Sequence, residues 1–539
     1  MPMSRNAWVP VLALPILALS EGRSTGQGAL PPQSVRDLSL LVARDRPCVW
    51  PSGMTPFAVV PTATFNLTGR HRDMLVIDEH TGTQWDAPAH FVPPPGSGYP
   101  GAGPMGLITG EKVPAWQFCG EACVVDVTSL RDKAEPGKSH LIGKDVVEAW
   151  EAGHRRLGPG DVVLFRSDYT DAYYKPFPLG DRFVATALRR QTPGWPAPTP
   201  ETMEYLAGRG VMTLGLDGAS MGPLPDLAVA THQAGGKRGM IWVECATNLG
   251  SLPATGSFFA LLAAKHAGGS GGECRCLAVT DKALARELIT RSRAKSVADL
   301  SVTLHEDYPV VWPGRGPGEE GGRYVGKILN AFAASRGPFF ALTHMFDSHA
   351  GTHLVMPAFS LPDMTDRGLP MDPRLASWRT EFEARHGKLP EAGPTTEKAP
   401  LESMMGQAHL VDVRPLRGTA KFSPESPAGP LITRAFLEEQ ARKRPFKPGE
   451  IVLFHSGFSD AEFKPLPAAP GKDGLFARPL EGSSEGWPSP TPEAVAYLAD
   501  AGIRCVGTDG PTLGGVDPKG SQFTDWMAAS RGQIGRAHV

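Results

Sequence analysis

The sequence predicts an α/β protein that contains two copies of one domain. Apolar runs at 162–165, 211–215 and 240–243 have the length and aliphatic character of buried strands. Segments 145–156 and 200–209 have the pattern of helices. Strands and helices therefore alternate along the chain, as they do in α/β domains.

Several short segments occur twice, which indicates an internal duplication. The clearest pairs are Ser34–Ser39 with Ser296–Ser301, Gly160–Phe165 with Gly449–Phe454, and Gly194–Pro200 with Gly486–Pro492. The two copies lie much further apart than the 20 to 50 residues that separate solenoid repeats. The repeat is therefore a whole domain.

The positions of the repeated segments predict how the chain is divided into domains. We expect a first copy at 33–280, a charged helical linker at 281–295 and a second copy at 296–533. An insertion at about 361–400, rich in charge and proline, is expected to be an exposed excursion. The last residues, 534–539, match one reading frame of a common sequencing adapter, so we expect a non-native tail there.

Composition is that of a soluble globular protein. The chain has 539 residues, of which 41% are hydrophobic and 20% are charged. A net charge of -2 gives no reason to expect nucleic acid or an anionic membrane as a partner. The 62 glycines and 53 prolines favour many loops over long helical bundles.

The N-terminus has the features of a secretory signal at residues 1–20. Arg5 precedes an apolar run, Trp8–Leu19, and Ala18–Ser20 is a small-x-small cleavage site. The run is too short to span a bilayer. We therefore expect a periplasmic or secreted protein with no membrane contact after processing.

The seven cysteines give no metal motif. An exported protein can form disulfides, and Cys119 and Cys123 are close enough in sequence to pair. The two CxxC-like pairs of a cysteine zinc site are missing. Most of the cysteines are expected to be small buried hydrophobic residues.

The segment His80–His90 concentrates metal-ligand chemistry in eleven residues. It contains two imidazoles, a carboxylate and a carboxamide, and histidine nitrogen and aspartate oxygen are ordinary ligands for zinc, manganese or iron. If the segment is extended, His80, Gln84, Asp86 and His90 point to one face. A polar loop that happens to hold two histidines is the alternative.

The same segment resembles the H-x-G-T-H-x-D-x-P-x-H signature of the metal-dependent cyclase family, which includes kynurenine formamidase and isatin hydrolase. Gln84 stands where the family usually has histidine. The resemblance implies a swivelling β/β/α domain, with a mixed, barrel-like sheet flanked by helices. It also implies that His80 and Asp86 bind metal and that His90 serves as acid/base.

The resemblance implies a second group of ligands downstream, His232 and Glu244. On their own, these residues fit a helix surface and a strand end. The implied ligand set for one or two zinc or manganese ions is therefore His80, Asp86, His232 and Glu244, with Gln84 as a weak ligand, a neighbour of the metal or a substrate contact. Ser220 lies in a turn that resembles one near the family's active site, where it is a candidate substrate-binding residue or a plain turn residue.

These residues predict an exported metal-dependent hydrolase that opens a small amide, lactam or lactone with metal-activated water. A non-catalytic protein that binds a small acid or metal on the same fold is the alternative, and His90 favours the enzyme because binding alone requires no base. Gly268–Gly272 has the letters of a serine-hydrolase elbow, but no helix pattern follows it. No dinucleotide-binding motif is found.

The second copy is predicted to have no active site. His349 and His353 remain, but Val355 and Phe359 occupy the aspartate and base positions, and neither can bind metal or move a proton. A loose alignment puts Arg531 near the place of His232 and leaves Glu244 without a counterpart. The second copy is expected to stand in for a partner subunit, with a homodimer as the alternative.

Overall fold

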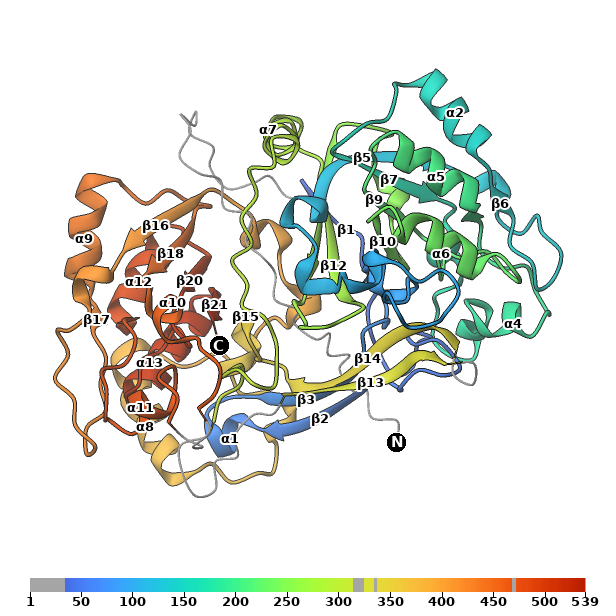
Figure 1. The fold of residues 1–539 in the computed structure, drawn as a ribbon. Coiled ribbons are helices and arrows are strands. Elements are labelled where there is room, and N and C mark those ends of the chain that lie inside the picture. The colour runs from blue at the N-terminus through green and yellow to red at the C-terminus, as the bar shows by residue number, and fades with distance from the viewer. Residues whose placement is uncertain (1–33, 314–323, 334–336, 468–471, 539) are drawn as a thin grey trace.

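The computed structural model describes residues 34–313, 324–333, 337–467 and 472–538. The predicted signal, 1–20, lies outside these ranges. The chain forms two α/β units side by side, joined along one edge by a long antiparallel sheet (Figure 1). Within the described ranges, no helix has the length and apolar character needed to cross a membrane.

A closed barrel forms the first unit. Its strands run in the order β12-β11-β5-β7-β9-β10-β4, and β4 also pairs with β12, so that the barrel closes. A further short strand, β1, extends from β12. The bounds are β1 Val35–Asp37, β4 Gln84–Asp86, β5 Cys119–Asp126, β7 Asp161–Arg166, β9 Thr213–Leu216, β10 Ile241–Glu244, β11 Ser257–Ala263 and β12 Gly271–Val279.

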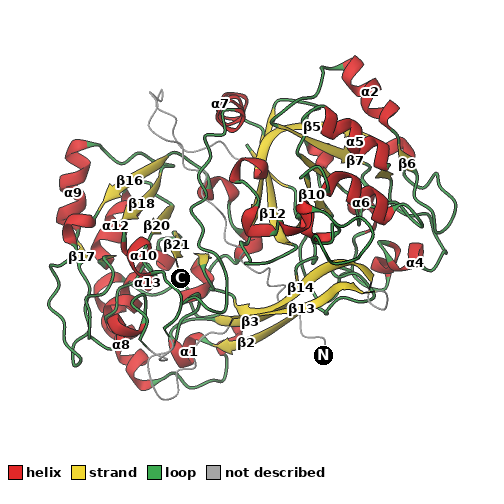
Figure 2. Ribbon diagram, in the orientation of Figure 1, coloured by secondary structure: helices red, strands yellow, loops and turns green. Residues whose placement is uncertain are grey.

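Helices cover the outer face of this barrel (Figure 2). Along β7, Val162 and Leu164 belong to the apolar cluster that contains Trp85, whereas Val163 and Phe165 belong to the cluster that packs against the helices. A strand buried on both faces needs such a continuous apolar run. The helices and short strands of the first unit are α2 Lys144–Gly153, α3 Tyr169–Tyr173, α4 Ala185–Leu188, α5 Pro200–Gly208, α6 Ala228–Gly236, β6 Leu141–Ile142 and β8 Ala197–Pro198.

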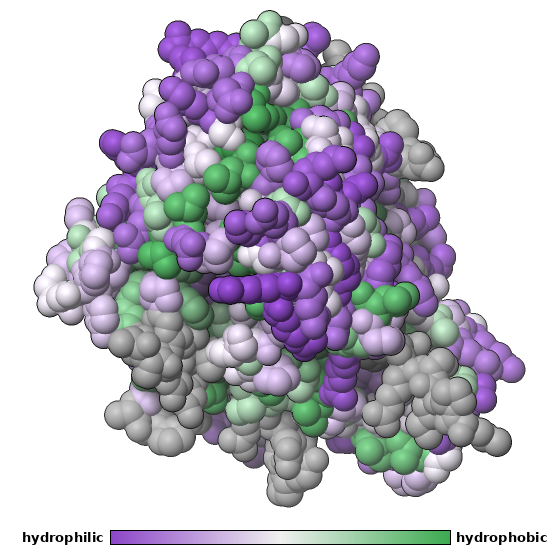
Figure 3. All heavy atoms as spheres, turned by 90° about the vertical axis from the view of Figure 1, so that its right-hand side faces the viewer, coloured by the Kyte–Doolittle hydropathy of each residue, from purple (hydrophilic) through white to green (hydrophobic). Residues whose placement is uncertain are grey.

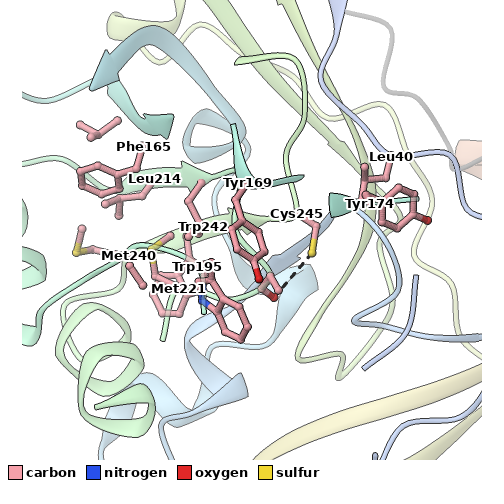
Figure 4. Packing of buried hydrophobic residues seen from close by; sticks show 14 of the residues in the cluster. Leu40, Phe165, Tyr169, Tyr174, Trp195, Leu214, Met221, Met240, Trp242 and Cys245 are labelled. Atoms are coloured by element: carbon pink, nitrogen blue, oxygen red, sulfur yellow. Dashed lines mark hydrogen bonds between the residues drawn. The ribbon is translucent and has the colours of Figure 1, made fainter. Parts of the chain in front are cut away.

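The predicted fold class is confirmed, and the predicted strands and helices fall on β7, β9, β10, α2 and α5. Trp242 of β10 lies in the helix-facing cluster beside Trp195, Met221 and Met240 (Figure 4). On the face turned away from the second unit, hydrophilic side chains cover most of the surface and hydrophobic ones form smaller groups (Figure 3).

The second unit repeats five of the barrel strands. Its sheet has the order β15-β21-β20-β18-β16, which corresponds to β4-β10-β9-β7-β5. The bounds are β15 Thr352–Val355, β16 Ala408–Asp412, β17 Leu431–Ile432, β18 Ile451–His455, β19 Ser489–Pro490, β20 Cys505–Thr508 and β21 Ile534–His538, with helices α8 Pro373–His386, α9 Arg434–Lys443, α10 Phe458–Glu462, α11 Ala477–Leu480, α12 Pro492–Asp500 and α13 Pro518–Ser530.

Each unit contributes one strand pair to the sheet that joins them. The order is β13-β14-β3-β2, with β2 Ala58–Ala63, β3 Arg72–Asp78, β13 Tyr324–Ala333 and β14 Gly337–Asp347, and the short helix α1 Phe65–Thr68 lies between β2 and β3. Asp78 pairs with Thr343, and Asp347 pairs with Met74. Because Asp78 and Asp347 occupy the same place in the two repeats, the pairing has an internal two-fold symmetry.

The units also share one apolar core. Phe258 and Leu277 on the barrel belong to the same buried cluster as Leu354, Leu453 and Ile534 of the second sheet. Helix α7, Lys282–Arg293, contributes Leu284 and Leu288 to this cluster. The segment predicted as a linker is therefore packed helix rather than a free connection.

The insertion at 361–400 differs from its prediction. It is not only an exposed excursion, because its helix α8 is anchored by Phe382, which is 1% exposed and packs at ring distances of 5.4 and 5.5 Å from Phe523 and Trp526. The prediction relied on the high average charge and proline content of the segment. A single aromatic side chain that points inward is enough to anchor the helix, and an average composition does not reveal it.

The cysteines follow the sequence prediction. All seven are buried and free. Cys119 and Cys123 both lie in β5, where a four-residue separation corresponds to roughly 13 Å, too far for a disulfide.

Candidate metal centre

Strand β4 places the signature segment against β10. Asp86 pairs with Trp242 and Gln84 pairs with Glu244, while on the other side Asp86 pairs with Gly271. A Cβ atom at Gly271 would lie 2.0 Å from the Trp85 carbonyl oxygen, so only glycine allows this close approach. Barrel closure therefore brings Asp86 and Glu244 to one spot, although about 160 residues separate them.

Five titratable side chains meet there. His232 Nε2 lies 3.3 Å from Glu244 Oε1 and 3.7 Å from Asp86 Oδ2. His80 Nδ1 is 3.1 Å from Asp86 Oδ1, and His90 Nε2 is 3.7 Å from Asp86 Oδ2. All five are buried. Of the four groups among the described residues that could hold a metal ion, two lie here, His80–Asp86–His90 and Asp86–His232–Glu244, and these two share Asp86.

Hydrogen bonds on their outer nitrogens orient two of the imidazoles. His232 Nδ1 lies 2.6 Å from the Ala228 carbonyl oxygen. His90 Nδ1 lies 2.6 Å from the Phe340 carbonyl oxygen. A carbonyl only accepts, so in each ring Nδ1 carries a proton, and Nε2, which faces the carboxylates, has the lone pair whenever the ring is neutral.

His80 is oriented in the opposite sense. Its Nε2 lies 3.0 Å from Ser270 Oγ, which itself donates to Glu79 Oε2 at 2.6 Å. Ser270 therefore accepts from His80 Nε2–H, so that Nδ1 is the nitrogen beside Asp86 and carries the lone pair whenever the ring is neutral. Such partners behind the ligand are typical of metal-binding histidines.

The carboxylates have orienting partners of their own. Trp242 Nε1 donates to Asp86 Oδ2 at 2.9 Å. Glu244 Oε1 accepts from Met221 N at 2.6 Å and from the Ser220 hydroxyl at 3.2 Å, and Gln84 Nε2 donates to Glu244 Oε2 at 3.1 Å. Gln84 and Ser220, both predicted site residues, therefore contact the same carboxylate.

Burial and mutual charge shift the pKa values in this centre. Burial, followed by the neighbouring Glu244, raises the pKa of Asp86. Burial alone would lower the pKa of His80, but its hydrogen bond to Asp86 raises it to about 9. Burial and the positive charge of His80 hold the pKa of His90 well below its usual range. His90 is therefore the neutral imidazole of the group.

The second unit supplies one wall of this centre. Besides the Phe340 carbonyl on His90, the Phe339 ring lies 5.5 Å from His90 and 5.8 Å from Phe91. Phe91 in turn stacks on His232 at 4.0 Å. The β13–β14 strand pair thus reaches across to the first unit's site (Figure 1).

Sequence reasoning missed Phe339, Phe340, Trp242, Glu79 and Ser270. Glu79 directly precedes the signature segment, and Ser270 lies in the glycine-rich stretch Gly268–Gly272, so a search for partners of His80 could have considered both. No local signal points to Phe340, because its contact to His90 spans 250 residues and uses a backbone atom.

The corresponding place in the second unit has different chemistry. His353 pairs across β15–β21 with Ala537, as Gln84 pairs with Glu244. Thr524 donates to the Pro490 carbonyl as Thr231 donates to the Pro198 carbonyl. The next residue, Asp525, therefore occupies the place of His232, and the alignment that put Arg531 there is wrong.

Asp525 has a different partner from His232. It forms an ion pair with Arg70 at 2.7 Å. Arg70 comes from the first unit's β2–β3 strand pair, so the exchange between the units is mutual. Among the described residues, no group suited to a metal ion contains His349 or His353.

Sequence comparison finds similarity to two hydrolases. The chain is 28% identical over 214 residues to the isatin hydrolase of Roseibium aggregatum, covering 39% of this chain and 74% of that protein. It is 28% identical over 219 residues to the kynurenine formamidase of Paracidovorax citrulli, covering 40% of this chain and 82% of that protein.

A solved structure and a family profile also match parts of the chain. Isatin hydrolase A from Ralstonia solanacearum aligns with a TM-score of 0.37 and 27% identity, covering 45% of this chain and 90% of that chain. The profile of the Cyclase family, described as "Putative cyclase", matches twice, at residues 36–223 and 298–514. The chain therefore belongs to the Cyclase family, and it contains the family's domain in two tandem copies.

Proposed function

We propose that the first unit is a metal-dependent hydrolase of a small amide, lactam or lactone. The observation that carries this proposal is the orientation of His80, His90 and His232, each of which places one ring nitrogen within 3.1 to 3.7 Å of an Asp86 oxygen. The relatives support the reaction type, because one is an isatin hydrolase and another a kynurenine formamidase.

The side chains present fit a divalent metal ion. Asp86 Oδ1 and His80 Nδ1 are buried and lie 3.1 Å from each other, and neither has a further hydrogen-bond partner. Keeping ionisable groups away from water is costly unless strong partners surround them, and an ion held by both side chains would be such a partner. We propose His80, Asp86, His232 and Glu244 as ligands of one or two ions, with zinc and manganese as the candidates.

Gln84 bears on the identity of the metal. A carboxamide oxygen is a weaker zinc donor than imidazole, and it suits harder ions such as manganese. The Gln84 amide nitrogen already donates to Glu244. We propose that Gln84 acts mainly by holding Glu244 in place.

His90 is proposed as the acid/base. A bound divalent ion supplies Lewis acidity and lowers the pKa of water. The Phe340 carbonyl fixes the His90 tautomer, so that Nε2 can accept a proton from the attacking water. The same Nε2–H can then protonate the leaving nitrogen or oxygen. The low pKa of His90 keeps the ring in the accepting state at the start.

The surroundings favour a small planar substrate. Phe91 and Phe339 form an aromatic wall beside His90, and flat acyl compounds pack well on such rings. Ser220 is proposed to act through Glu244, to which its hydroxyl donates, rather than through a direct substrate contact alone.

We also propose that the protein is exported to the periplasm or secreted. The signal-like features of residues 1–20 support this proposal.

The function is tested with metal analysis and a panel of formamides, lactams and lactones. We expect the metal-loaded protein to hydrolyse at least one class. Asp86→Ala and His80→Ala should lose metal and activity together, because both remove a proposed ligand. Folded variants that retain full metal would refute these ligands. A metal-loaded parent protein that hydrolyses nothing would favour a binding protein instead.

Exchange of the unusual carboxamide is a second test. Gln84→His should keep activity and tighten zinc, since imidazole is the better zinc donor. Metal titration monitored by a competing chelator measures the change. Weaker zinc binding in a well-folded variant would show that position 84 does not face the ion.

Removal of the proposed base should separate chemistry from binding. His90→Ala should retain the metal but lower kcat by about 10²–10⁴, the usual contribution of a positioned acid/base group. Single-turnover kinetics at matched metal occupancy give the comparison. An unchanged kcat would exclude the role.

The second unit is expected to line the first unit's site without supplying metal ligands or an acid/base residue. The double variant His349→Ala with His353→Ala should keep the metal content and kcat of the parent protein, because these rings belong to no ligand group. Thermal unfolding shows whether the variant is folded. A large fall in kcat in a folded double variant would contradict a silent second copy.

A further inference from the structure

A cavity of about 250 Å³ lies between the two units. Thr81, Glu273 and Arg275 line it from the first unit, and Glu397 and Met356 from the second. None of the proposed metal ligands lines it. The cavity is therefore separate from the metal centre, although Thr81 follows the ligand His80 directly.

Four oxygen atoms on three side chains around this cavity have no hydrogen-bond partner. They are Thr81 Oγ1, both carboxylate oxygens of Glu273 and Glu397 Oε2, and Thr81 and Glu273 are 0% and 2% exposed. Buried polar atoms are nearly always paired in folded proteins. Four such atoms on one cavity favour a ligand that pairs with them.

The charge of the lining favours a cation. Asp37 is balanced by Arg275, whose Nε and Nη2 donate to its Oδ2 at 3.1 and 2.6 Å. Arg275 Nη1 donates to the Thr396 carbonyl. The remaining charged groups of the lining, Glu273 and Glu397, are both carboxylates.

Glu273 has one cationic neighbour outside the lining. His266 Nε2 lies 3.5 Å from Glu273 Oε1. Burial lowers the pKa of His266, but Glu273 and the nearby Glu79 outweigh it and raise the pKa overall. Even a protonated His266 is thus shared between two carboxylates. Glu397 accepts from the Thr395 hydroxyl through Oε1, and its Oε2 has no hydrogen-bond partner among the described residues.

Most of the remaining wall is apolar. Leu40, Val42, Leu354, Met356 and Met404 all line the cavity. A bare metal ion would leave this wall unused, and it would need six or more oxygen ligands if it were calcium. An organic cation uses both parts of the lining.

We propose that this cavity binds a primary organic ammonium ion that has an apolar body. An ammonium group has three N–H donors and no acceptor, which matches the unpaired oxygens of Thr81, Glu273 and Glu397. The apolar body then packs on the leucine and methionine side chains.

The ligand would contact two segments that hold the metal centre. Thr81 continues from His80, and Glu273 on β12 pairs with Gln84 on β4. The site goes beyond the proposed hydrolysis, because Glu397 and the apolar wall of the second unit take no part in that reaction.

Calorimetric titration of the metal-loaded, full-length protein tests the proposal, with benzylammonium as the probe. We expect saturable binding at one site. Benzyl alcohol has no charge, and benzyltrimethylammonium has no N–H donor. The affinity of each should be at least about tenfold lower than that of benzylammonium, which corresponds to the loss of a charge-assisted hydrogen bond. Equal affinity for either compound would overturn the proposal.

Variants locate the site. Glu397→Gln should weaken benzylammonium binding about tenfold, and Glu273→Gln should do the same if it folds. Glu391→Gln, an exposed glutamate nearby in sequence, is the matched control and should bind as the parent does. Unchanged affinity in Glu397→Gln, or calcium binding that displaces benzylammonium, would refute an ammonium site here.

Discussion

Closure of the barrel by strand β4 is the constraint on which the metal centre depends. β4 has only three residues, yet it pairs with β10 on one side and β12 on the other. This double pairing fixes the height of Gln84 and Asp86 relative to Glu244, because register in a sheet is set in steps of one residue pair. A one-residue slip would turn Asp86 toward the interior cluster around Trp85 and dismantle the centre.

The charges that this closure brings together must stabilise one another. Asp86 and Glu244 are both buried, and burying two carboxylates side by side is costly without compensating cations. His80 and His232 provide part of the compensation through contacts at 3.1 and 3.3 Å. A divalent ion would provide the rest of the positive charge. Metal binding and the folding stability of this region should therefore depend on the same residues.

The internal two-fold symmetry shows how the second copy contributes to the first unit's site, although its own His349 and His353 belong to no ligand group among the described residues. Its β14 strand pairs with β3 and carries Phe339 and the Phe340 carbonyl to His90. The first unit returns the contact through Arg70, which pairs with Asp525. In the second unit, Val355 occupies the position of Asp86. This replacement of a ligand leaves the backbone and packing contacts intact. The second unit can therefore lose chemistry and keep its structural role.

The sequence by itself determined the repeat, the α/β class, the main strands and the family of the chain. These features are local: an apolar run is buried wherever it packs, and the signature segment holds its ligands within eleven residues. It also pointed to His232 and Glu244, which the barrel does bring beside Asp86. Only the tertiary structure decided which histidine nitrogen faces the centre, that Asp525 replaces His232, that Phe382 anchors the insertion, and that a cavity with both carboxylate and apolar side chains lies between the units. Each of these depends on contacts between segments far apart in the chain, and such contacts leave no periodic signal in the sequence.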